Sequence, residues 1–213
     1  MLELGIKSLL GYLLGSLMGS LIVGQLRGGV DIRTQGSGNA GGTNALRTQG
    51  KLFALCVMLI DVGKGALAAG WFPDLAIPGI GIDAGVDRQW LTVACASAVI
   101  LGHVYPLWFG FRGGKGAATL VGALLGIQPA LLIPVLLVWL VVLLLTGYVG
   151  LATMCAGVAL PVYVCATEPV PPPALVTFSV LIAVFVVFTH RSNIARMFQG
   201  SEHRARKPWL PGR

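Results

Sequence analysis

Three stretches of this 213-residue chain combine glycine with small hydroxyl or amide side chains and with arginine or lysine. They begin at Gly36, Gly102 and Thr189. Glycine lets backbone N–H groups turn inward as an anion-binding nest, and a helix N-terminus adds a favourable dipole. Arginine can bind a phosphate through two nitrogens. The three stretches therefore have the composition of phosphate-binding segments, although loops of membrane proteins are commonly glycine-rich and basic for other reasons.

The polar side chains of these stretches divide into hydrogen-bonding groups, cations and histidines. The hydroxyl and amide groups are Ser37, Asn39, Thr43 and Asn44. The cations are Arg47, Arg112, Lys115, Arg191 and Arg196. The histidines of the chain, His103, His190 and His203, all lie in or beside the stretches. Together these groups offer the charge and the hydrogen bonds that suit a phosphate.

Two other features of the sequence invite functional interpretations. The segment from Gly36 to Gly41 matches GxGxxG, and Asp61 follows 20 residues later. That fingerprint requires a preceding strand in a βαβ unit, and an apolar run precedes it here, so a dinucleotide site is excluded. Asp61 and Lys64 lie within an apolar run, where charges are costly and often functional. They form either a structural ion pair facing the bundle interior or a site in which Lys64 faces an anion below the loops.

The composition indicates what must position these groups. The chain is 55% hydrophobic with a mean hydropathy of +0.82, and 11% of it is charged, against roughly 25% in soluble domains. These values exclude a soluble globular protein, a disordered chain and a disulfide-rich secreted scaffold. A transmembrane helix needs about 20 apolar residues, so the chain has room for six or seven spans. The four cysteines lie in apolar runs without a CxxC pair and are interpreted as packed free thiols.

The number and orientation of the spans follow from the apolar runs and from the arginine and lysine residues between them. The runs are 4–25, 52–72, 89–109, 117–167 and 174–189. Under the positive-inside rule, the loop 26–51, the loop near 111–116 and the tail are cytoplasmic, whereas 73–88 and 168–173 lie outside. The tail contributes Arg191, Arg196, Arg204, Arg206, Lys207 and Arg213, and the outer segments contribute Asp74, Asp83, Asp87 and Glu168.

Parity then divides the long run 117–167 into three short spans, near 115–127, 129–146 and 150–167. The prediction is an all-α polytopic membrane protein with seven transmembrane helices, the N-terminus outside and the C-terminus cytoplasmic. Residues 1–213 form a single integral membrane domain in this prediction. Its cytoplasmic active-site segments are 26–51, 102–119 and 189–206.

Taken together, the three stretches resemble the bacterial acyl-phosphate-dependent glycerol-3-phosphate acyltransferases of the PlsY type. The first motif is similar to Gly36-Ser37-Gly38-Asn39-x-Gly41-x-Thr43-Asn44-x-x-Arg47. The second is similar to Gly102-His103-x-x-Pro106, then Phe111-x-Gly113-Gly114-Lys115-Gly116 and Thr119. The third is similar to Thr189-His190-Arg191-x-Asn193-Ile194-x-Arg196 with Gly200, Glu202 and Arg204, and an Asp61-x-x-Lys64-Gly65 element also matches. The departures, Ala40 and Gly42, touch no polar position.

The resemblance implies transfer of a fatty acyl group from acyl-phosphate to the 1-hydroxyl of glycerol 3-phosphate, which gives lysophosphatidic acid for phospholipid synthesis. It implies a bacterial inner-membrane enzyme with no cofactor, no metal and no nucleic-acid partner, in transient contact with the enzyme that makes acyl-phosphate. The implied catalytic residues are Ser37, Asn39, Arg47, His103, Lys115 and His190. The implied phosphate-binding residues are Gly36, Gly38, Gly41, Thr43, Asn44, Lys64, Arg112, Gly113, Gly114, Gly116, Arg191, Asn193, Arg196 and Glu202.

This chemistry suits the residues present. An acyl-phosphate is an activated mixed anhydride, so positioning and charge stabilisation suffice and no Ser-His-Asp triad is needed. The proton of the attacking hydroxyl goes to the donor phosphate or to His103 or His190. We favour the phosphate, because the sequence places no carboxylate to orient either imidazole. Glu202 is expected to pack against arginines of the tail. A small anion transporter is disfavoured because no internal repeat is visible.

Overall fold

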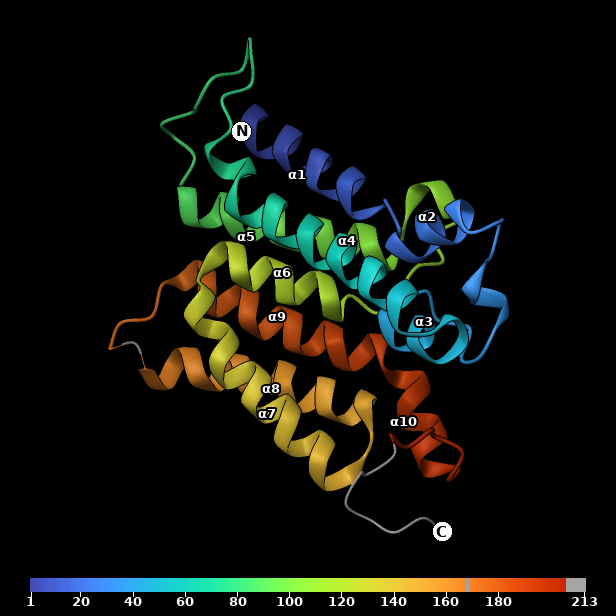
Figure 1. The fold of residues 1–213 in the computed structure, drawn as a ribbon. Coiled ribbons are helices and arrows are strands. Elements are labelled where there is room, and N and C mark those ends of the chain that lie inside the picture. The colour runs from blue at the N-terminus through green and yellow to red at the C-terminus, as the bar shows by residue number, and fades with distance from the viewer. Residues whose placement is uncertain (168, 206–213) are drawn as a thin grey trace. The chain divides into compact units, whose positions relative to one another are not determined.

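The computed structural model describes residues 1–167 and 169–205, and every regular element within these ranges is a helix (Figure 1). The all-α prediction is therefore confirmed for this part of the chain. The contacts divide the chain into two compact units, Met1–Pro129 and a second that begins at Ala130. The single domain over 1–213 stays a prediction. Glu168, Arg206, Lys207 and Arg213, which entered the charge argument, lie outside the described residues.

The first unit is built around α4. Its helices are α1 (Leu2–Gly15), α2 (Gly19–Leu26), α3 (Gly42–Gln49), α4 (Lys51–Gly70), α5 (Arg88–Val104) and α6 (Ala117–Ile127), with short 3-10 turns at Ile32–Thr34, Phe72–Asp74 and Leu107–Phe109. Helix α4 contacts each of the other five, most extensively α6. A Cβ at Gly65 would collide with the carbonyl of Thr119, and one at Gly122 with that of Val62. Glycine at these two positions therefore lets the two backbones touch.

Buried charges fix one end of the first unit. Lys7 and Glu3 pair at 2.7 Å with neither side chain exposed, and Arg88 donates to both oxygens of Glu3 at 2.8 and 2.7 Å. The Glu3 carboxylate also accepts from the backbone N–H of Asp83 at 2.8 Å. The start of α1 and the 71–87 segment therefore lie at the same end of the unit, as expected of two segments on one side of a membrane.

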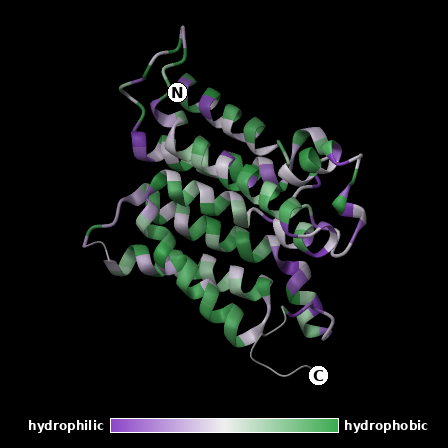
Figure 2. Ribbon diagram, viewed as in Figure 1, coloured by the Kyte–Doolittle hydropathy of each residue, from purple (hydrophilic) through white to green (hydrophobic). Residues whose placement is uncertain are grey.

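The second unit contains α7 (Leu132–Thr146), α8 (Val149–Thr167), α9 (Pro173–Thr189) and α10 (Arg191–Phe198), and the 3-10 turn Pro129–Leu131 lies at the boundary between the two units. Helix α8 contacts both α7 and α9, and α10 contacts α8 and α9. Helix α7 exposes Ile133, Leu137 and Leu145 by 72%, 59% and 71%. Large apolar side chains exposed along one helix are typical of a surface that contacts lipid or another protein. Figure 2 shows the same pattern, with hydrophobic helices and hydrophilic residues gathered at helix ends and loops.

The predicted spans correspond to helices or helix pairs. Among the described residues, four helices are long and apolar enough to cross a membrane, and up to six when each bent pair counts as one span. The bent pairs are α1 with α2, at 44°, and α9 with α10, at 49°. Helix α6 is apolar but has 11 residues, too few for a full span. The structure thus supports four to six spans, and the count of seven stays a prediction.

Candidate active site

The first glycine-rich stretch is a loop organised by one buried amide. Asn44, in the first turns of α3, accepts from the backbone N–H of Ser37 at 3.0 Å. Its Nδ2 donates to the carbonyls of Ile32 and Gln35 at 2.9 and 3.0 Å. The Asn44 side chain therefore holds the loop in its conformation through three hydrogen bonds. The remaining predicted groups of this stretch lie at or near the surface. Asn39 and Gly41 are half-buried, and the exposed residues are Gly36, Ser37, Gly38, Thr43 and Arg47.

The second stretch turns back onto the end of α5. The N–H groups of Gly113 and Gly114 donate to the carbonyls of Val104 and His103, each at 3.1 Å. A Cβ at Gly114 would collide with the imidazole of His103, which is 2% exposed. These two glycines therefore close a turn over His103, and their amides are occupied by it. The turn delivers the half-buried Lys115 and the buried Gly116 to the start of α6, and Arg112 lies exposed just before it.

The first two stretches lie together at the end of the first unit opposite the Glu3 cluster. Arg33 donates to the carbonyls of Phe109 and Arg112 at 3.1 and 3.2 Å and forms an ion pair with Asp31 at 2.7 Å. The Arg33 guanidinium, which donates to both oxygens of Asp31, lowers the pKa of that carboxyl below its ordinary value of 3.8. These bonds hold the loop that leads into the first stretch against the second stretch. That the two stretches share one substrate site stays a prediction.

Asp61 and Lys64 adopt the ion-pair alternative. The Nζ of Lys64 lies 3.0 Å from Oδ1 of Asp61 and donates to the carbonyls of Gly15 and Leu17 at 2.9 and 2.8 Å. An ammonium group has three hydrogens, so these three acceptors use all of them. Lys64 was predicted to bind phosphate, and in this structure it instead binds the chain between α1 and α2.

A carboxylate does lie beside one of the two candidate imidazoles, contrary to the sequence-based expectation. Oδ1 of Asp61 lies 3.4 Å from Nδ1 of His103. The expectation failed because the two residues meet only through the packing of α4 against α5. His190 is oriented differently: its Nδ1 lies 2.8 Å from the carbonyl oxygen of Val186, so this nitrogen is the donor. A neutral His190 then carries its lone pair on Nε2.

The third stretch belongs to the second unit. The buried Asn193 donates to Oε1 of Glu202 at 2.7 Å, and Nε of Arg196 donates to Oε2 at 2.6 Å. Glu202 therefore packs against an arginine of this stretch, as the sequence predicted. Arg191 lies at the surface with its guanidinium 4.4 Å from the centre of the Phe188 ring. The stretch is thus a bent helix end, with α10 and the following turn closed around one carboxylate.

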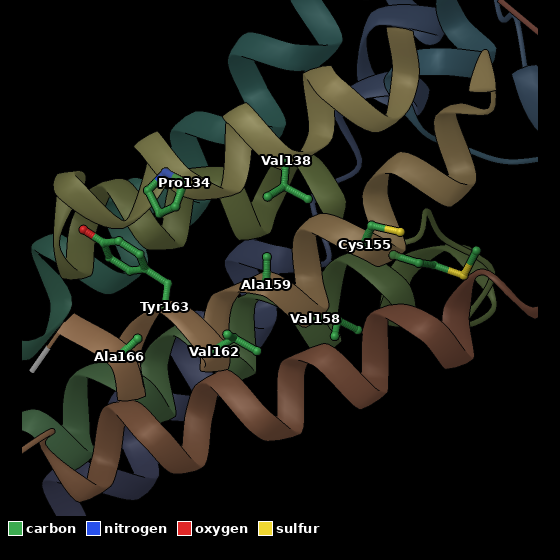
Figure 3. Close-up of a pocket in the computed structure, with 9 residues that line it drawn as sticks. Pro134, Val138, Cys155, Val158, Ala159, Val162, Tyr163 and Ala166 are labelled. Carbon is green, nitrogen blue, oxygen red and sulfur yellow. The ribbon is translucent and has the colours of Figure 1, made fainter. Parts of the chain in front are cut away.

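The second unit also holds an open apolar groove of about 660 Å³ between α7 and α8 (Figure 3). The residues that line it are Pro134, Val138, Met154, Cys155, Val158, Ala159, Val162, Tyr163 and Ala166. Figure 3 shows Val138 and Pro134 on one wall and the side chains of α8 on the other. A surface of this composition accommodates hydrocarbon, either lipid or an acyl chain.

The sequence matches one family along nearly all of its length. The profile of the family described as glycerol-3-phosphate acyltransferase matches residues 6–200. The chain belongs to the glycerol-3-phosphate acyltransferase family. A glycerol-3-phosphate acyltransferase from Synechococcus sp. (strain JA-2-3B'a(2-13)) is 40% identical over 200 residues, covering 93% of each chain. One from Azotobacter vinelandii is 41% identical over 197 residues, covering 92% of this chain and 96% of the relative.

Two crystal structures of PlsY, described as an integral membrane glycerol 3-phosphate acyltransferase, have the same fold. The glycerol 3-phosphate form has a TM-score of 0.80 and 33% identity, covering 94% of each chain. The lysophosphatidic acid form has a TM-score of 0.80 and 32% identity, covering 96% of each chain. This member of the acyltransferase family is accordingly an integral membrane protein.

Sequence reasoning missed the residues that hold the site of this acyltransferase together. Ser16 accepts from the N–H of Leu107 at 3.2 Å, and Ser20 donates to the carbonyl of Ala40 at 2.7 Å. The role of Asp31 and Arg33 was also missed. A signal existed for the serines, because two small hydroxyl residues flank Gly19 inside an apolar run, where a helix break is favoured. Among the described residues, no group of three or more His, Cys, Asp or Glu could hold a metal ion.

Proposed function

We propose that this protein transfers a fatty acyl group from an acyl-phosphate to the 1-hydroxyl of glycerol 3-phosphate. The products are lysophosphatidic acid and inorganic phosphate. The observation that carries the proposal is the family match over residues 6–200, in a chain whose first two glycine-rich stretches lie at one end of the first unit. The related PlsY structures, in glycerol 3-phosphate and lysophosphatidic acid forms, support the acceptor and the product.

The reaction needs two phosphate groups side by side and one acyl carbon between them. The 1-hydroxyl oxygen attacks the carbonyl carbon, a new ester bond forms, and the bond from that carbon to the phosphate oxygen breaks. The phosphate leaves with the electron pair of that bond. Arginine and lysine side chains near the two phosphates stabilise the leaving anion and hold the hydroxyl in line with the carbonyl.

We assign the substrate contacts to groups of the three stretches that are exposed or half-buried, and to His190, which is 5% exposed. The direct contacts are Ser37, Asn39, Arg47, Lys115, His190 and Arg196, and Thr43, Arg112 and Arg191 add hydrogen bonds and charge. Asn44, Gly113, Gly114, Asn193 and Glu202 hold the shapes of the stretches, since their polar groups are bonded within the protein. The acyl chain lies in an apolar groove between helices, for which the α7–α8 groove is the candidate.

The proton of the attacking hydroxyl passes to the departing phosphate in this proposal. The leaving phosphate lies next to the hydroxyl by necessity, because both are bonded to the same carbon in the transition state. His103 lies beside Asp61, and its ring is buried beneath the turn at Gly114, which suits support of the turn better than contact with substrate. His190 is the remaining histidine candidate for a base.

The membrane arrangement completes the proposal. We infer seven membrane segments, with the N-terminus outside and the three stretches at the cytoplasmic face of a bacterial inner membrane. Acyl-phosphate is then delivered from the cytoplasm by transient contact with the enzyme that makes it. A cytoplasmic site is consistent with the basic loops, which the positive-inside rule places there.

The direct experiment follows product formation by the purified protein in lipid vesicles. Palmitoyl-phosphate and glycerol 3-phosphate together should give lysophosphatidic acid and inorganic phosphate in a 1:1 ratio. Omission of glycerol 3-phosphate should abolish both. Phosphate release that continues without the acceptor, with no lysophosphatidic acid formed, would identify a hydrolase and contradict the proposal.

A further inference from the structure

Both glycine-rich stretches of the first unit are attached to the bend between α1 and α2. Ser16 is the first residue after α1. Its hydroxyl oxygen accepts from the N–H of Leu107 at 3.2 Å and so holds the second stretch. Ser20, in the first turn of α2, donates to the carbonyl of Ala40 at 2.7 Å and so holds the first stretch. The position of this bend therefore sets the positions of both stretches at once.

Asp61 and Lys64 hold the bend by satisfying the two helix ends that meet there. The last carbonyls of α1 and the first N–H groups of α2 have no partner within their own helices. Lys64 binds the carbonyls of Gly15 and Leu17, and Asp61 accepts from the N–H of Gly19 at 3.3 Å. A cation thus lies at a helix C-terminus and an anion at a helix N-terminus, and each charge complements the dipole of its helix.

Asp61 also reaches the second stretch from below. Its Oδ1 lies 3.4 Å from Nδ1 of His103, and the backbone carbonyl of His103 accepts from the N–H of Gly114. Oδ2 of Asp61 and Nδ1 of His103 are both fully buried and have no hydrogen-bond partner among the described residues. Oδ1 of Asp61 therefore lies beside the imidazole at an ion-pair distance, and the carboxylate borders the ring that lies beneath Gly114.

We propose that Asp61, together with Lys64, is a positioning residue for acyl transfer: the pair holds the α1–α2 bend and the His103 ring, and through them the two glycine-rich stretches. The inference rests on the proposed function for its effect on turnover. Asp61 is fully buried, so it does not contact substrate directly. It acts through the groups whose positions it sets. Without its charge, the stretches lose their common anchor and the substrate phosphates are held out of line.

A second buried ion pair in the same unit is the matched control. Glu3 and Lys7 also lie one helical turn apart, also with neither side chain exposed, and also bind backbone carbonyls or amides. They hold the 71–87 segment at the opposite end of the unit. Loss of the Glu3 charge should therefore affect stability as loss of the Asp61 charge does, without moving either glycine-rich stretch.

The test compares Asp61→Asn with Glu3→Gln and with the double variant Asp61→Asn/Lys64→Met, each reconstituted and corrected for the folded fraction. The double variant removes the unpaired buried cation that could unfold Asp61→Asn. We expect kcat to fall by about 10- to 100-fold in both Asp61 variants, because a misplacement of 1 Å can cost about 100-fold. We expect KM to change less than kcat, and Glu3→Gln to keep a wild-type kcat.

Hydrogen–deuterium exchange provides a readout that needs no turnover. Peptides covering 36–47 and 102–119 should exchange faster in both Asp61 variants than in the wild type, and at the wild-type rate in Glu3→Gln. Wild-type exchange in the double variant, or an equal loss of kcat in Glu3→Gln, would overturn the inference. If the wild type itself makes no lysophosphatidic acid, the proposed function fails, and the exchange comparison still decides the role of Asp61.

Discussion

Nδ1 of His103, near the end of α5, lies 3.4 Å from Oδ1 of Asp61 in the middle of α4. The imidazole lies between this carboxylate and the turn that leads to Lys115. This placement also changes what histidine variants can report, because a variant of His103 disturbs the turn as well as any proton transfer. The identity of the base therefore has to be decided by pH dependence together with rate.

The first prediction concerns the proton. His103→Gln and His190→Gln should each keep measurable turnover, because glutamine retains hydrogen-bonding capacity and the donor phosphate accepts the proton. If one imidazole were the base, its variant would lose about 10²–10⁴ in kcat. The measurement is the pH profile of kcat for each variant beside the wild type.

An acidic limb that vanishes in one variant while its kcat collapses would show that this histidine is the base. The Asp31–Arg33 pair does not interfere with this comparison. Because the folded-state pKa of Asp31 is lowered, the contribution of the pair is fully present above pH 3.8 and is lost only as the pH falls through the lowered value. If a histidine is the base, the acidic limb of the kcat profile lies instead between about pH 5 and 8.

The second prediction concerns the phosphate contacts. Alanine at Ser37, Asn39, Arg47, Lys115, His190 or Arg196 should remove most activity while the protein still inserts and folds. The loss of one charge-assisted contact in a desolvated site costs about 1.5–3 kcal/mol, or about ten- to a hundredfold in kcat/KM. Lys51→Ala, which removes an exposed cation just beyond the first stretch, is the matched control and should keep wild-type activity. Near-normal activity in most site variants would mean that the stretches are structural.

The third prediction is the orientation in the membrane. In a variant whose four cysteines are replaced by alanine, we expect a membrane-impermeant thiol reagent added to intact cells to label Ala84→Cys and not Leu46→Cys. Both positions are exposed, and they lie at opposite ends of the first unit. Permeabilised cells, in which both should react, provide the control. Labelling of Leu46→Cys in intact cells would reverse the topology.

The fourth prediction concerns the acyl chain. Tryptophan at Ala159 would fill the α7–α8 groove, and we expect it to raise KM for palmitoyl-phosphate much more than KM for a short-chain acyl-phosphate. Leu181→Trp, at a residue of α9 that is 64% exposed, places a tryptophan outside the groove and should leave both values unchanged. Equal effects on long and short donors would show that the acyl chain binds elsewhere.

Sequence predicts the helices of this protein well because apolar runs and charged loops are local signals. Each predicted span corresponds to a helix or a bent helix pair, and the contact between Glu3 and the 71–87 segment agrees with the predicted sidedness. The bend after Gly15 was not predicted, because no proline marks it and the glycine and serine residues from 15 to 20 also fit an unbroken helix within the apolar run 4–25. It exists because Lys64 and Asp61, from another helix, satisfy the two helix ends.

The sequence identified which residues belong to the candidate site better than it identified what each of them binds. Glycine, arginine and amide spacing identified the stretches, but whether an amide faces a ligand or its own loop depends on the fold. Asn44 and Gly114 have their polar groups bonded within the protein, whereas Ser37 and Thr43 are exposed. The pairing of Asp61 with His103 depends on helix packing, and no sequence spacing encodes it.

The most direct test of the central claim is the choice of donor. Purified protein in vesicles would receive glycerol 3-phosphate with palmitoyl-phosphate, palmitoyl-CoA or palmitoyl carrier protein, one at a time, and lysophosphatidic acid would be measured. We predict product with palmitoyl-phosphate alone, because the site is built from phosphate-binding groups and needs an activated anhydride. Equal turnover with palmitoyl-CoA or with the carrier protein would contradict this account of the reaction.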